Sequence, residues 1–321
     1  MTDPNDTPNP HAPGHAQAIK ALKASSVKGW LLISLFQALA KLPRCFRTAL
    51  GWILAKLAPL VVPRRIKIVR RNLALCFADL PAQEREQMLR DHLRALTQTL
   101  VDRSVLWFGT PDAIKKLVTL KGFENLAYFV DRQLPVMMLA PHFVGLDAAA
   151  SRLTMIGPEG ATMYAVQGSP LIDELVRLGR ARFHKVHMIS RRDGVRSLLK
   201  LIKRAVPFYY LPDMDFGKRG AVFVPFFGVM AATQTSTAQL ARQFDLPVVP
   251  IICSWDPQTG TYEVDIQPAL ANFPNPDQTI EQDTAHLNEL LEGWIRANPT
   301  QYYWVHRRFK SRPEGEPSLY E

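Results

Sequence analysis

Acidic side chains are missing from almost the whole first quarter of the sequence. In a chain of 321 residues, no Asp or Glu stands between Thr7 and Ala78, whereas twelve Lys and Arg residues do. Residues 79–321 hold equal numbers of acidic and basic side chains, so the net charge of +10 comes from the N-terminal segment. A nucleic-acid enzyme more often carries basic charge around its site, so we expect an anionic membrane surface, not nucleic acid, as the partner.

Cysteine is scarce as well. Cys45, Cys76 and Cys253 are far apart and odd in number, which gives no disulfide framework and no zinc spacing and fits a reducing compartment. The sequence also lacks a glycine-rich phosphate loop and a dinucleotide fingerprint. We therefore expect no cofactor.

Uninterrupted apolar runs of 18 residues, the usual length of a spanning helix, are also missing. Residues 30–40 are almost free of polar groups, and residues 49–62 are apolar with few exceptions. No cleavage site of a signal peptide is evident. Segment 18–78 therefore predicts basic, hydrophobic helices that lie in, or dip into, the cytoplasmic face of an anionic membrane. A membrane span over 29–50 and an ordinary pair of core helices are the alternatives.

Composition divides the chain into three parts. Residues 1–17 are rich in Pro, Asn, Asp and His and predict a disordered tail. The membrane-associating segment 18–78 follows, and residues 79–321 form the remaining domain. That domain begins with apolar residues at helical spacing, which predict a long helix over 79–108.

From about residue 117 onward, short apolar runs alternate with amphipathic stretches. Strands are expected at 136–140, 162–166, 186–189, 207–211 and 247–255. Helices are expected at 145–156, 170–184, 193–205, 232–244 and 280–297. This alternation is typical of an α/β fold with a mostly parallel sheet flanked by helices. Ligands of such sheets bind at the carboxyl ends of the strands.

A histidine stands at one of these strand ends. The apolar run 136–140 leads to His142, and Asp147 follows after four intervening residues, near the start of the next expected helix. In one continuous helix the two side chains would lie about 140° apart, but across a strand-to-helix turn they can meet. A carboxylate on an imidazole fixes its tautomer and raises its basicity, so the pair predicts a general base. The alternative is a loop histidine without catalytic function.

A polar loop follows the expected strand 207–211. It contains two acids and two bases that we take as candidate substrate-binding residues: Asp213, Asp215, Lys218 and Arg219. One interpretation is a metal-binding Asp-x-Asp, as in many nucleotide-sugar glycosyltransferases. A second is a loop that binds a phosphorylated or acyl substrate. A solvated turn is the third.

Arginines cluster around the expected strand 186–189. Phosphate recognition is one function of such a cluster, and a solvated helix face is the alternative. The candidate substrate-binding residues here are Arg180, Arg182 and Arg192.

Together these motifs resemble the late acyltransferases of lipid A biosynthesis, the lauroyl and myristoyl transferases of Gram-negative bacteria, within the lysophospholipid acyltransferase superfamily. The resemblance runs from about residue 28 to the C-terminus. The motifs that carry it are Arg70-Arg-Asn72-Leu-Ala-Leu-Cys-Phe77, Ala140-Pro-His142-Phe-Val-Gly-Leu-Asp147, Arg192-Asp-Gly-Val-Arg196, Tyr210-Leu-Pro-Asp213-Met-Asp215-Phe-Gly217, Phe223-Val-Pro-Phe-Phe-Gly228, Leu246-Pro-Val-Val-Pro250 and Gln301-Tyr-Tyr-Trp-Val-His-Arg-Arg-Phe-Lys310.

The resemblance implies a glycerolphosphate-acyltransferase-like sandwich over 79–321, docked on the cytoplasmic face of the inner membrane. It implies transfer of an acyl chain from acyl carrier protein to a hydroxyl of a 3-hydroxyacyl chain on a lipid A precursor. The family's signature, His followed after four residues by Asp or Glu, carries onto His142 and Asp147. His142 would be the general base and Asp147 would orient it, without a metal. The alternatives are acylation of a lysophospholipid or another glycolipid, an Asp-x-Asp glycosyltransferase and a membrane adaptor.

Overall fold

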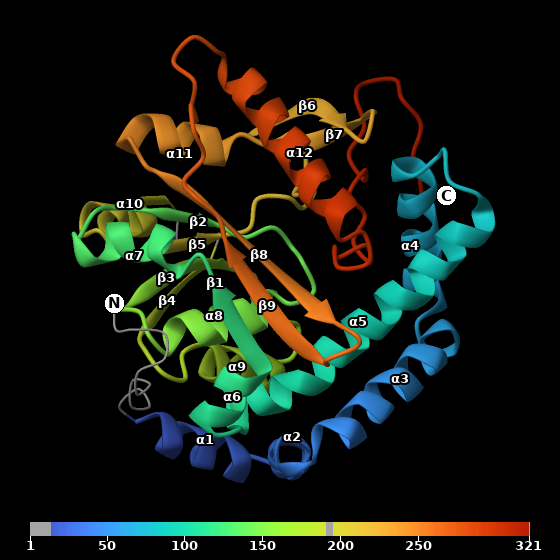
Figure 1. Cartoon of the computed structure of the whole chain (residues 1–321), viewed down its shortest axis with the longest axis vertical. Coiled ribbons are helices and arrows are strands. Elements are labelled where there is room, and N and C mark those ends of the chain that lie inside the picture. The colour runs from blue at the N-terminus through green and yellow to red at the C-terminus, as the bar shows by residue number, and fades with distance from the viewer. Residues whose placement is uncertain (1–13, 191–194, 321) are drawn as a thin grey trace.

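A seven-stranded sheet forms the centre of the protein in a computed structural model that describes residues 14–190 and 195–320 (Figure 1). The strand order is β1-β9-β8-β2-β5-β3-β4, and every neighbouring pair is parallel except β8 and β9. The strands are β1 (Val118–Lys121), β2 (Met137–Leu139), β3 (Gly160–Tyr164), β4 (Val186–Ser190), β5 (Phe208–Tyr210), β8 (Val248–Asp256) and β9 (Thr261–Ile266). The predicted α/β class with a mostly parallel sheet is confirmed.

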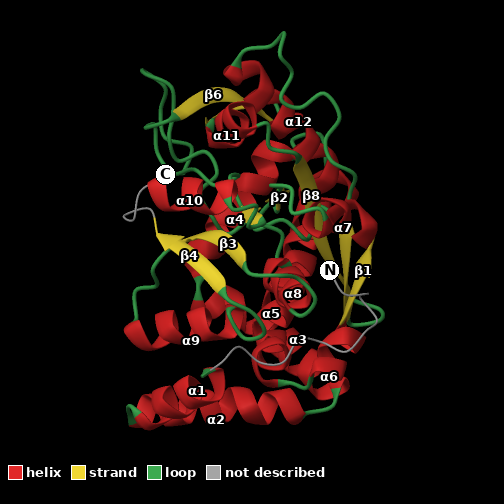
Figure 2. Cartoon of the chain, turned by 90° about the vertical axis from the view of Figure 1, so that its left-hand side faces the viewer, coloured by secondary structure: helices red, strands yellow, loops and turns green. Residues whose placement is uncertain are grey.

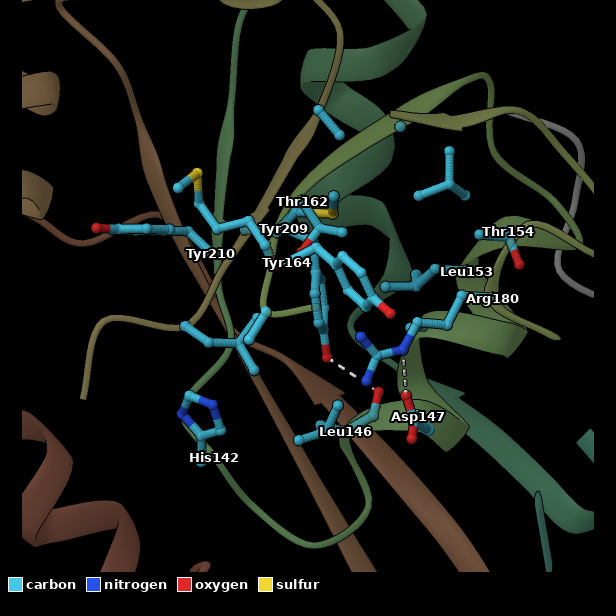
Figure 3. A pocket seen from close by; sticks show the side chains of 18 of the residues that line it. His142, Leu146, Asp147, Leu153, Thr154, Thr162, Tyr164, Arg180, Tyr209 and Tyr210 are labelled. Atoms are coloured by element: carbon cyan, nitrogen blue, oxygen red, sulfur yellow. Dashed lines mark hydrogen bonds and ion pairs between the residues drawn. The ribbon is translucent and has the colours of Figure 1, made fainter. Parts of the chain in front are cut away.

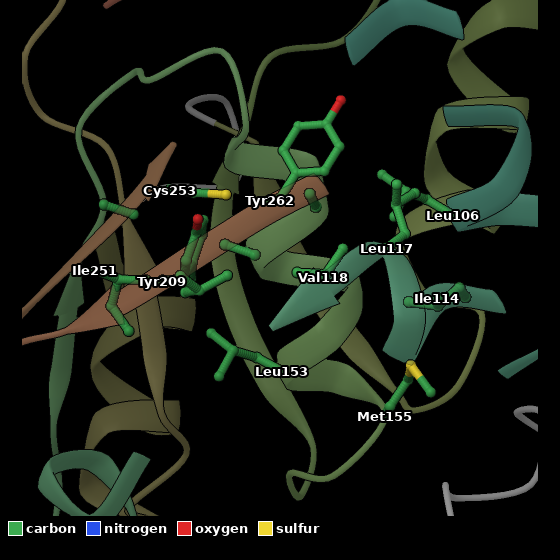
Figure 4. Packing of buried hydrophobic residues seen from close by; sticks show 14 of the residues in the cluster. Leu106, Ile114, Leu117, Val118, Leu153, Met155, Tyr209, Ile251, Cys253 and Tyr262 are labelled. Atoms are coloured by element: carbon green, nitrogen blue, oxygen red, sulfur yellow. The ribbon is translucent and has the colours of Figure 1, made fainter. Parts of the chain in front are cut away.

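Helices cover both faces of this sheet. They are α5 (Ala82–Phe108), α6 (Pro111–Leu117), α7 (Phe123–Asp131), α8 (Leu146–Thr154), α9 (Pro170–Arg180), α10 (Val195–Lys203), α11 (Ser236–Phe244) and α12 (Ile280–Ala297). Side chains of β2 alternate between the faces, as the twofold period of a strand requires. Met138 packs in the cluster formed with α5, α6 and α8, whereas Met137 and Leu139 pack with α10 and α11. Figure 4 shows part of the first cluster, including Leu106 of α5, Ile114 of α6 and Leu153 of α8.

A two-stranded hairpin stands beside the main sheet. Its antiparallel strands are β6 (Ala221–Phe226) and β7 (Val229–Gln234). Phe227 and Gly228 make the turn, both at positive φ, which matches the twist of a tight hairpin. The helix predicted over 232–244 is therefore wrong at its start, because residues up to 234 pair in β7 and α11 begins at Ser236.

Four helices precede the domain: α1 and α2 lie at one end of the molecule, and α3 and α4 continue from there along α5 (Figures 1 and 2). They are α1 (His15–Ala24), α2 (Val27–Lys41), α3 (Arg44–Val61) and α4 (Pro63–Cys76). Because α1 begins at His15, the tail predicted to end at residue 17 is too long by three residues. Its residues 1–13 lie outside the part that the structure describes.

Helix α3 is fixed to the domain by one close approach and one buried ion pair. A Cβ on Gly51 would stand 2.5 Å from Gln98 Oε1 of α5, so only glycine lets the two helices come this close. Arg47 Nε lies 3.1 Å from Asp102 Oδ1, and both side chains are buried. Asp102 also accepts hydrogen bonds from Gln98 and from Tyr262 of β9. This network ties α3 through α5 to the sheet.

Helices α2 and α3, with the short links that follow them, expose most of the large apolar side chains that face solvent. These are Val27, Trp30, Leu31, Leu35, Leu42, Phe46, Trp52, Ile53, Leu54, Leu57, Leu60, Val61 and Val62, here called the apolar face. Among the described residues, no single helix has the length and hydropathy of a membrane span. Helices α3 and α4 have the length and hydropathy of a span only when they are taken together, and a bend of 96° separates them.

Candidate active site

His142 lies directly after β2, in the turn that leads into α8, and its partner is Asp213. The imidazole Nδ1 is 2.8 Å from Asp213 Oδ1, and the His142 amide donates to Asp213 Oδ2 at 3.0 Å. Since a charged carboxylate only accepts hydrogen bonds, a neutral imidazole in this position carries its proton on Nδ1 and keeps its lone pair on Nε2. This is the tautomer that a general base requires.

The sheet brings the two residues together. Asp213 follows β5, which pairs in parallel with β2, so the loops after both strands meet at the same edge. Burial of Asp213 would raise the pKa of its carboxyl, but the charge of His142 and its two hydrogen bonds outweigh burial and lower the pKa to about 2. Asp213 is therefore a permanently charged partner of the imidazole at neutral pH.

Asp147, the predicted partner of His142, holds two arginines instead, of which Figure 3 shows Arg180. Its Oδ1 is 2.9 Å from Arg180 Nε of α9, and its Oδ2 is 2.7 Å from a terminal nitrogen of Arg103 on α5. Burial would raise the pKa of Asp147, but the two guanidinium groups lower it to about 2. The prediction that Asp147 orients the imidazole is wrong, because the first turn of α8 directs this carboxylate toward α5 and α9.

Gly145 shapes the turn that separates these two side chains. A Cβ at this position would lie 2.6 Å from Sγ of Cys253 on β8, so the turn passes the sheet at a distance that only glycine permits. The amide of Val144 donates to Gln301 O and the amide of Tyr303 donates to His142 O, which fixes the turn on its other side. The histidine is therefore held by backbone contacts as well as by Asp213.

An apolar cavity of about 370 Å³ opens beside His142. Leu146, Ala150 and Leu153 of α8 form one wall, and the length of β3 forms the other (Figure 3). Because β3 runs parallel to its neighbours, its first residue, Gly160, lies at the edge of the sheet away from His142. The cavity thus extends from the histidine along the strand direction, and Arg103, Arg180 and Asp147 also line it. Its shape and lining suit a hydrocarbon chain.

Arg103 is not predicted by any motif, because a lone arginine on the expected helix 79–108 cannot be told from a solvated one. Arg180 is the only one of the three predicted arginines that lines this cavity within the described part of the chain. Arg182 is 4% exposed and donates to the carbonyls of Leu106 and Gly109 at the end of α5. Its predicted role in substrate binding is wrong, because it joins α9 to α5. Arg192 lies outside the described residues.

The polar loop after β5 separates into three kinds of residue. Asp215 accepts hydrogen bonds from the Ser311 amide, the Ser311 hydroxyl and the Gly217 amide, and so ties the loop to the C-terminal segment. Lys218 and Arg219 are exposed and do not line the cavity. Of the four residues predicted in this loop, the structure thus brings only Asp213 to the histidine.

The Asp-x-Asp interpretation does not fit this arrangement. Asp213 is committed to His142 and Asp215 to Ser311, so the two carboxylates do not converge on one position. Within residues 14–190 and 195–320, no group of three or more His, Cys, Asp or Glu side chains could hold a metal ion.

The C-terminal segment 301–309 forms the back of the site. Tyr302, Trp304 and Phe309 are buried, and the Tyr302 hydroxyl donates to Asp213 O. Tyr303 lines the cavity and its ring faces that of His142, with 6.4 Å between centroids. His306 is buried behind Tyr303, and burial lowers its pKa to about 4. This segment closes the core and supports the imidazole.

Comparisons with known proteins now bear on this site. The model of the bacterial lipid A biosynthesis acyltransferase family matches residues 15–311. The chain is 35% identical to the lipid A biosynthesis lauroyltransferase of Escherichia coli (strain K12), over 91% of this chain and 94% of that protein. It is 33% identical to a lipid A biosynthesis acyltransferase of Haemophilus influenzae, over 91% and 93%. It is 30% identical to the palmitoleoyltransferase of the same Escherichia coli strain, over 91% and 94%.

A solved structure was also found by similarity of fold. The 1-acyl-sn-glycerophosphate acyltransferase of Thermotoga maritima matches with a TM-score of 0.35 and 12% identity, over 78% of this chain and 98% of that chain.

Proposed function

The chain belongs to the bacterial lipid A biosynthesis acyltransferase family, and from that premise we propose how it performs acyl transfer. The donor is a fatty acyl thioester on acyl carrier protein, and the acceptor is the hydroxyl of a 3-hydroxyacyl chain on a lipid A precursor. His142 is the general base, and Asp213 orients it. The observation that carries this proposal is the His142–Asp213 pair at the opening of an apolar cavity.

A secondary hydroxyl is a poor nucleophile near neutral pH, so its proton must leave as the oxygen attacks. Nε2 of His142 takes that proton while the hydroxyl oxygen bonds to the thioester carbon. The tetrahedral intermediate then breaks its carbon–sulfur bond, and the imidazolium returns the proton to the leaving thiolate. The products are the new ester and the free thiol of the carrier. Asp213 stays charged and stabilises the imidazolium between the two steps.

The acyl chain occupies the cavity between α8 and β3. Its thioester end lies at His142, and its methyl end points toward Gly160. Each methylene that enters such an apolar space contributes about 0.8 kcal/mol of binding. This favours a donor with a long chain and places the reacting carbon beside the base.

Arg103 and Arg180 together carry one positive charge more than Asp147 neutralises. Their guanidinium groups line the cavity, and their side chains are 31% and 25% exposed. This surplus charge stabilises negative charge next to the thioester, either on the oxyanion of the tetrahedral intermediate or on a phosphate of the substrate. Asp147 is then a positioning residue that holds the two arginines.

The apolar face of α2 and α3 docks the protein on the cytoplasmic surface of the inner membrane. Lys28, Lys41, Arg44 and Lys56 are exposed along the same helices, and each basic residue near an anionic surface contributes about 1 kcal/mol. Lys56 Nζ lies 3.8 Å from the centre of the Trp52 ring, so a cation and an aromatic share one position on α3. Both are favoured at the interface between headgroups and acyl chains.

Mass spectrometry of lipid A from a strain without the gene tests this function. The expected result is a lipid A species that lacks one acyl chain, restored by the wild-type gene but not by His142→Ala at equal protein level. An unchanged number of acyl chains in the deletion strain would reject lipid A as the acceptor.

A further inference from the structure

We propose that the exposed cationic side of α4, together with Lys310, is the surface on which the acidic acyl carrier protein docks. This inference rests on the proposed function, because it locates the partner that brings the acyl donor. The partner is recognised by chemistry: an acidic protein surface that presents a thioester on a flexible arm. The cations involved are Arg64, Lys67, Arg71 and Lys310, here called the cationic surface. Lys310 is near α4 because the amide of the preceding Phe309 donates to the Tyr320 hydroxyl, which donates to Asn72 of α4.

Helix α4 has two sharply different sides. Ile66, Val69 and Leu73 recur at helical spacing and are buried against the domain. Arg64, Lys67 and Arg71 recur at the same spacing on the exposed side. In the described part of the chain, Arg70 is the residue of α4 that pairs with a carboxylate, that of Glu86. Arg64, Lys67 and Arg71 have no ion-pair partner there, although Arg71 donates a hydrogen bond to the carbonyl of Leu319, so the charge of all three is available to an acidic partner.

Helix α4, which carries three of these cations, packs against the segment that lies beside His142. Asn72 of α4 donates to the carbonyls of Trp304 and His306, and Arg65 donates to the carbonyl of Val305. Tyr303, the neighbouring residue, lines the cavity and donates its amide to His142 O. A carrier bound on α4 therefore stands next to the segment that forms one side of the cavity opening.

A protein partner fits this surface better than lipid does. The exposed large apolar side chains of the N-terminal helices end at Val62, and among the described residues α4 exposes none. Helix α4 also turns away from α3 by 96°. If α3 lies along the membrane, α4 rises from it and holds its cations in the aqueous layer. Cations without apolar neighbours are typical of electrostatic steering between soluble surfaces, which raises association rates by about 10- to 1,000-fold.

The test is a charge reversal measured with two donors. The variant Arg64→Glu/Lys67→Glu/Lys310→Glu changes exposed side chains for which no hydrogen bond or ion pair is recorded in the described structure. Initial rates are measured in detergent with acyl carrier protein thioester and with the small N-acetylcysteamine thioester of the same acyl chain. We expect KM for the carrier thioester to rise about tenfold or more with kcat retained. We expect KM for the small thioester to stay unchanged.

A matched variant controls for net charge. It reverses three exposed cations of α10, on the opposite side of the molecule in Figure 1: Arg196→Glu, Lys200→Glu and Lys203→Glu. Its KM for the carrier thioester should equal that of the wild type. An equal rise of KM in both variants, or no rise in the α4 variant, overturns the docking surface while the proposed function stands.

Two further results separate the remaining explanations. If the α4 variant loses binding to phosphatidylglycerol vesicles but keeps its KM for the carrier thioester, the surface binds lipid and the proposal is overturned. If the wild type uses the small thioester but not the carrier thioester, both the donor in the proposed function and the docking surface are wrong. If kcat/KM for the carrier thioester loses its salt dependence in the α4 variant, and kcat/KM for the small thioester does not change, the result supports docking on the cationic surface.

Discussion

Replacing Asp213 by Asn separates the orientation of His142 from the packing around it. Asn has nearly the same shape as Asp, so the buried position remains filled. The carboxylate of Asp213 accepts a hydrogen bond from Nδ1 of His142 at 2.8 Å, whereas the amide nitrogen of Asn is a donor. When the amide nitrogen points toward Nδ1, it favours the tautomer of His142 with the proton on Nε2. Nε2 then has no lone pair and cannot act as the general base.

The expected effect of Asp213→Asn on kcat follows from the negative charge that Asp213 carries beside His142. The pKa of Asp213 falls from an ordinary 3.8 to about 2, so the folded protein favours the charged carboxylate by about 2 kcal/mol. General-base catalysis contributes about 10²- to 10⁴-fold, and loss of the correct tautomer removes most of it. We therefore expect kcat of Asp213→Asn to fall about 10²- to 10⁴-fold with KM for the acyl donor little changed, because the acyl cavity is intact.

Asp147→Asn is the matched comparison, since it removes the same charge from another buried carboxylate. Its arginine partners are partly solvated, so we expect a loss of about 1–3 kcal/mol in the free energy of unfolding. We also expect KM to rise, because Arg103 and Arg180 lose their fixed positions. Thermal unfolding of both variants in detergent checks the fold, and acyl transfer measured over pH 5–9 gives kcat and KM. If Asp213→Asn keeps wild-type kcat while Asp147→Asn abolishes it, the assigned partner of His142 is wrong.

Three other predictions concern pH, chain length and the membrane. Burial lowers the pKa of His92 and of His306 to about 4. As the pH falls, both histidines therefore become protonated in the unfolded chain before they do so in the folded protein. Urea titrations should show the free energy of unfolding decrease by about 2 kcal/mol per histidine between pH 7 and 5. Gly160→Leu should fill the far end of the cavity, where a Cβ meets nothing closer than 3.9 Å, and kcat/KM for the longest acyl donors should fall about fourfold per excluded methylene while short donors react normally. Leu57→Ser/Leu60→Ser removes two exposed side chains of the apolar face and should weaken sedimentation with anionic vesicles at least about tenfold, with the fold unchanged.

Each of these predictions has its own contradicting result. A free energy of unfolding that is flat from pH 7 to 5 would show that the two histidines are not held neutral. Equal losses for short and long donors in Gly160→Leu would place the acyl chain elsewhere. Leu134→Ser, an exposed leucine far along the chain from the apolar face, is the control for the vesicle assay and should bind as the wild type does.

Local patterns predict the central part of the fold well. The strand expected at 186–189 is β4, and the helix expected at 280–297 is α12 with the same ends. Its capping box, Thr279 with Gln282, gives a local start signal. In contrast, β1 and β9 are stabilised mainly by pairing with each other and with β8, and such pairing has no local signature.

The catalytic pair shows where sequence reasoning ends. His142 and Asp213 each follow a strand, and the rule that ligands gather at strand ends selects both. Their contact depends on β2 and β5 being neighbours, although 71 residues separate the pair in sequence. Asp147 is close to His142 in sequence, but in the first turn of α8 its carboxylate points toward Arg103 and Arg180, which donate hydrogen bonds to it. Proximity in sequence therefore selects the wrong carboxylate, and only the strand order corrects it.

Acyl transfer by the purified protein tests the central claim most directly. Acyl carrier protein thioester and a lipid A precursor are incubated with wild type or with His142→Ala, and the lipid is analysed by mass spectrometry. The wild type should yield a lipid heavier by one acyl group with release of the carrier thiol, and His142→Ala, folded as judged by its unfolding transition, should yield none above background. Product formed by His142→Ala at the wild-type rate would contradict the role of His142 as the general base.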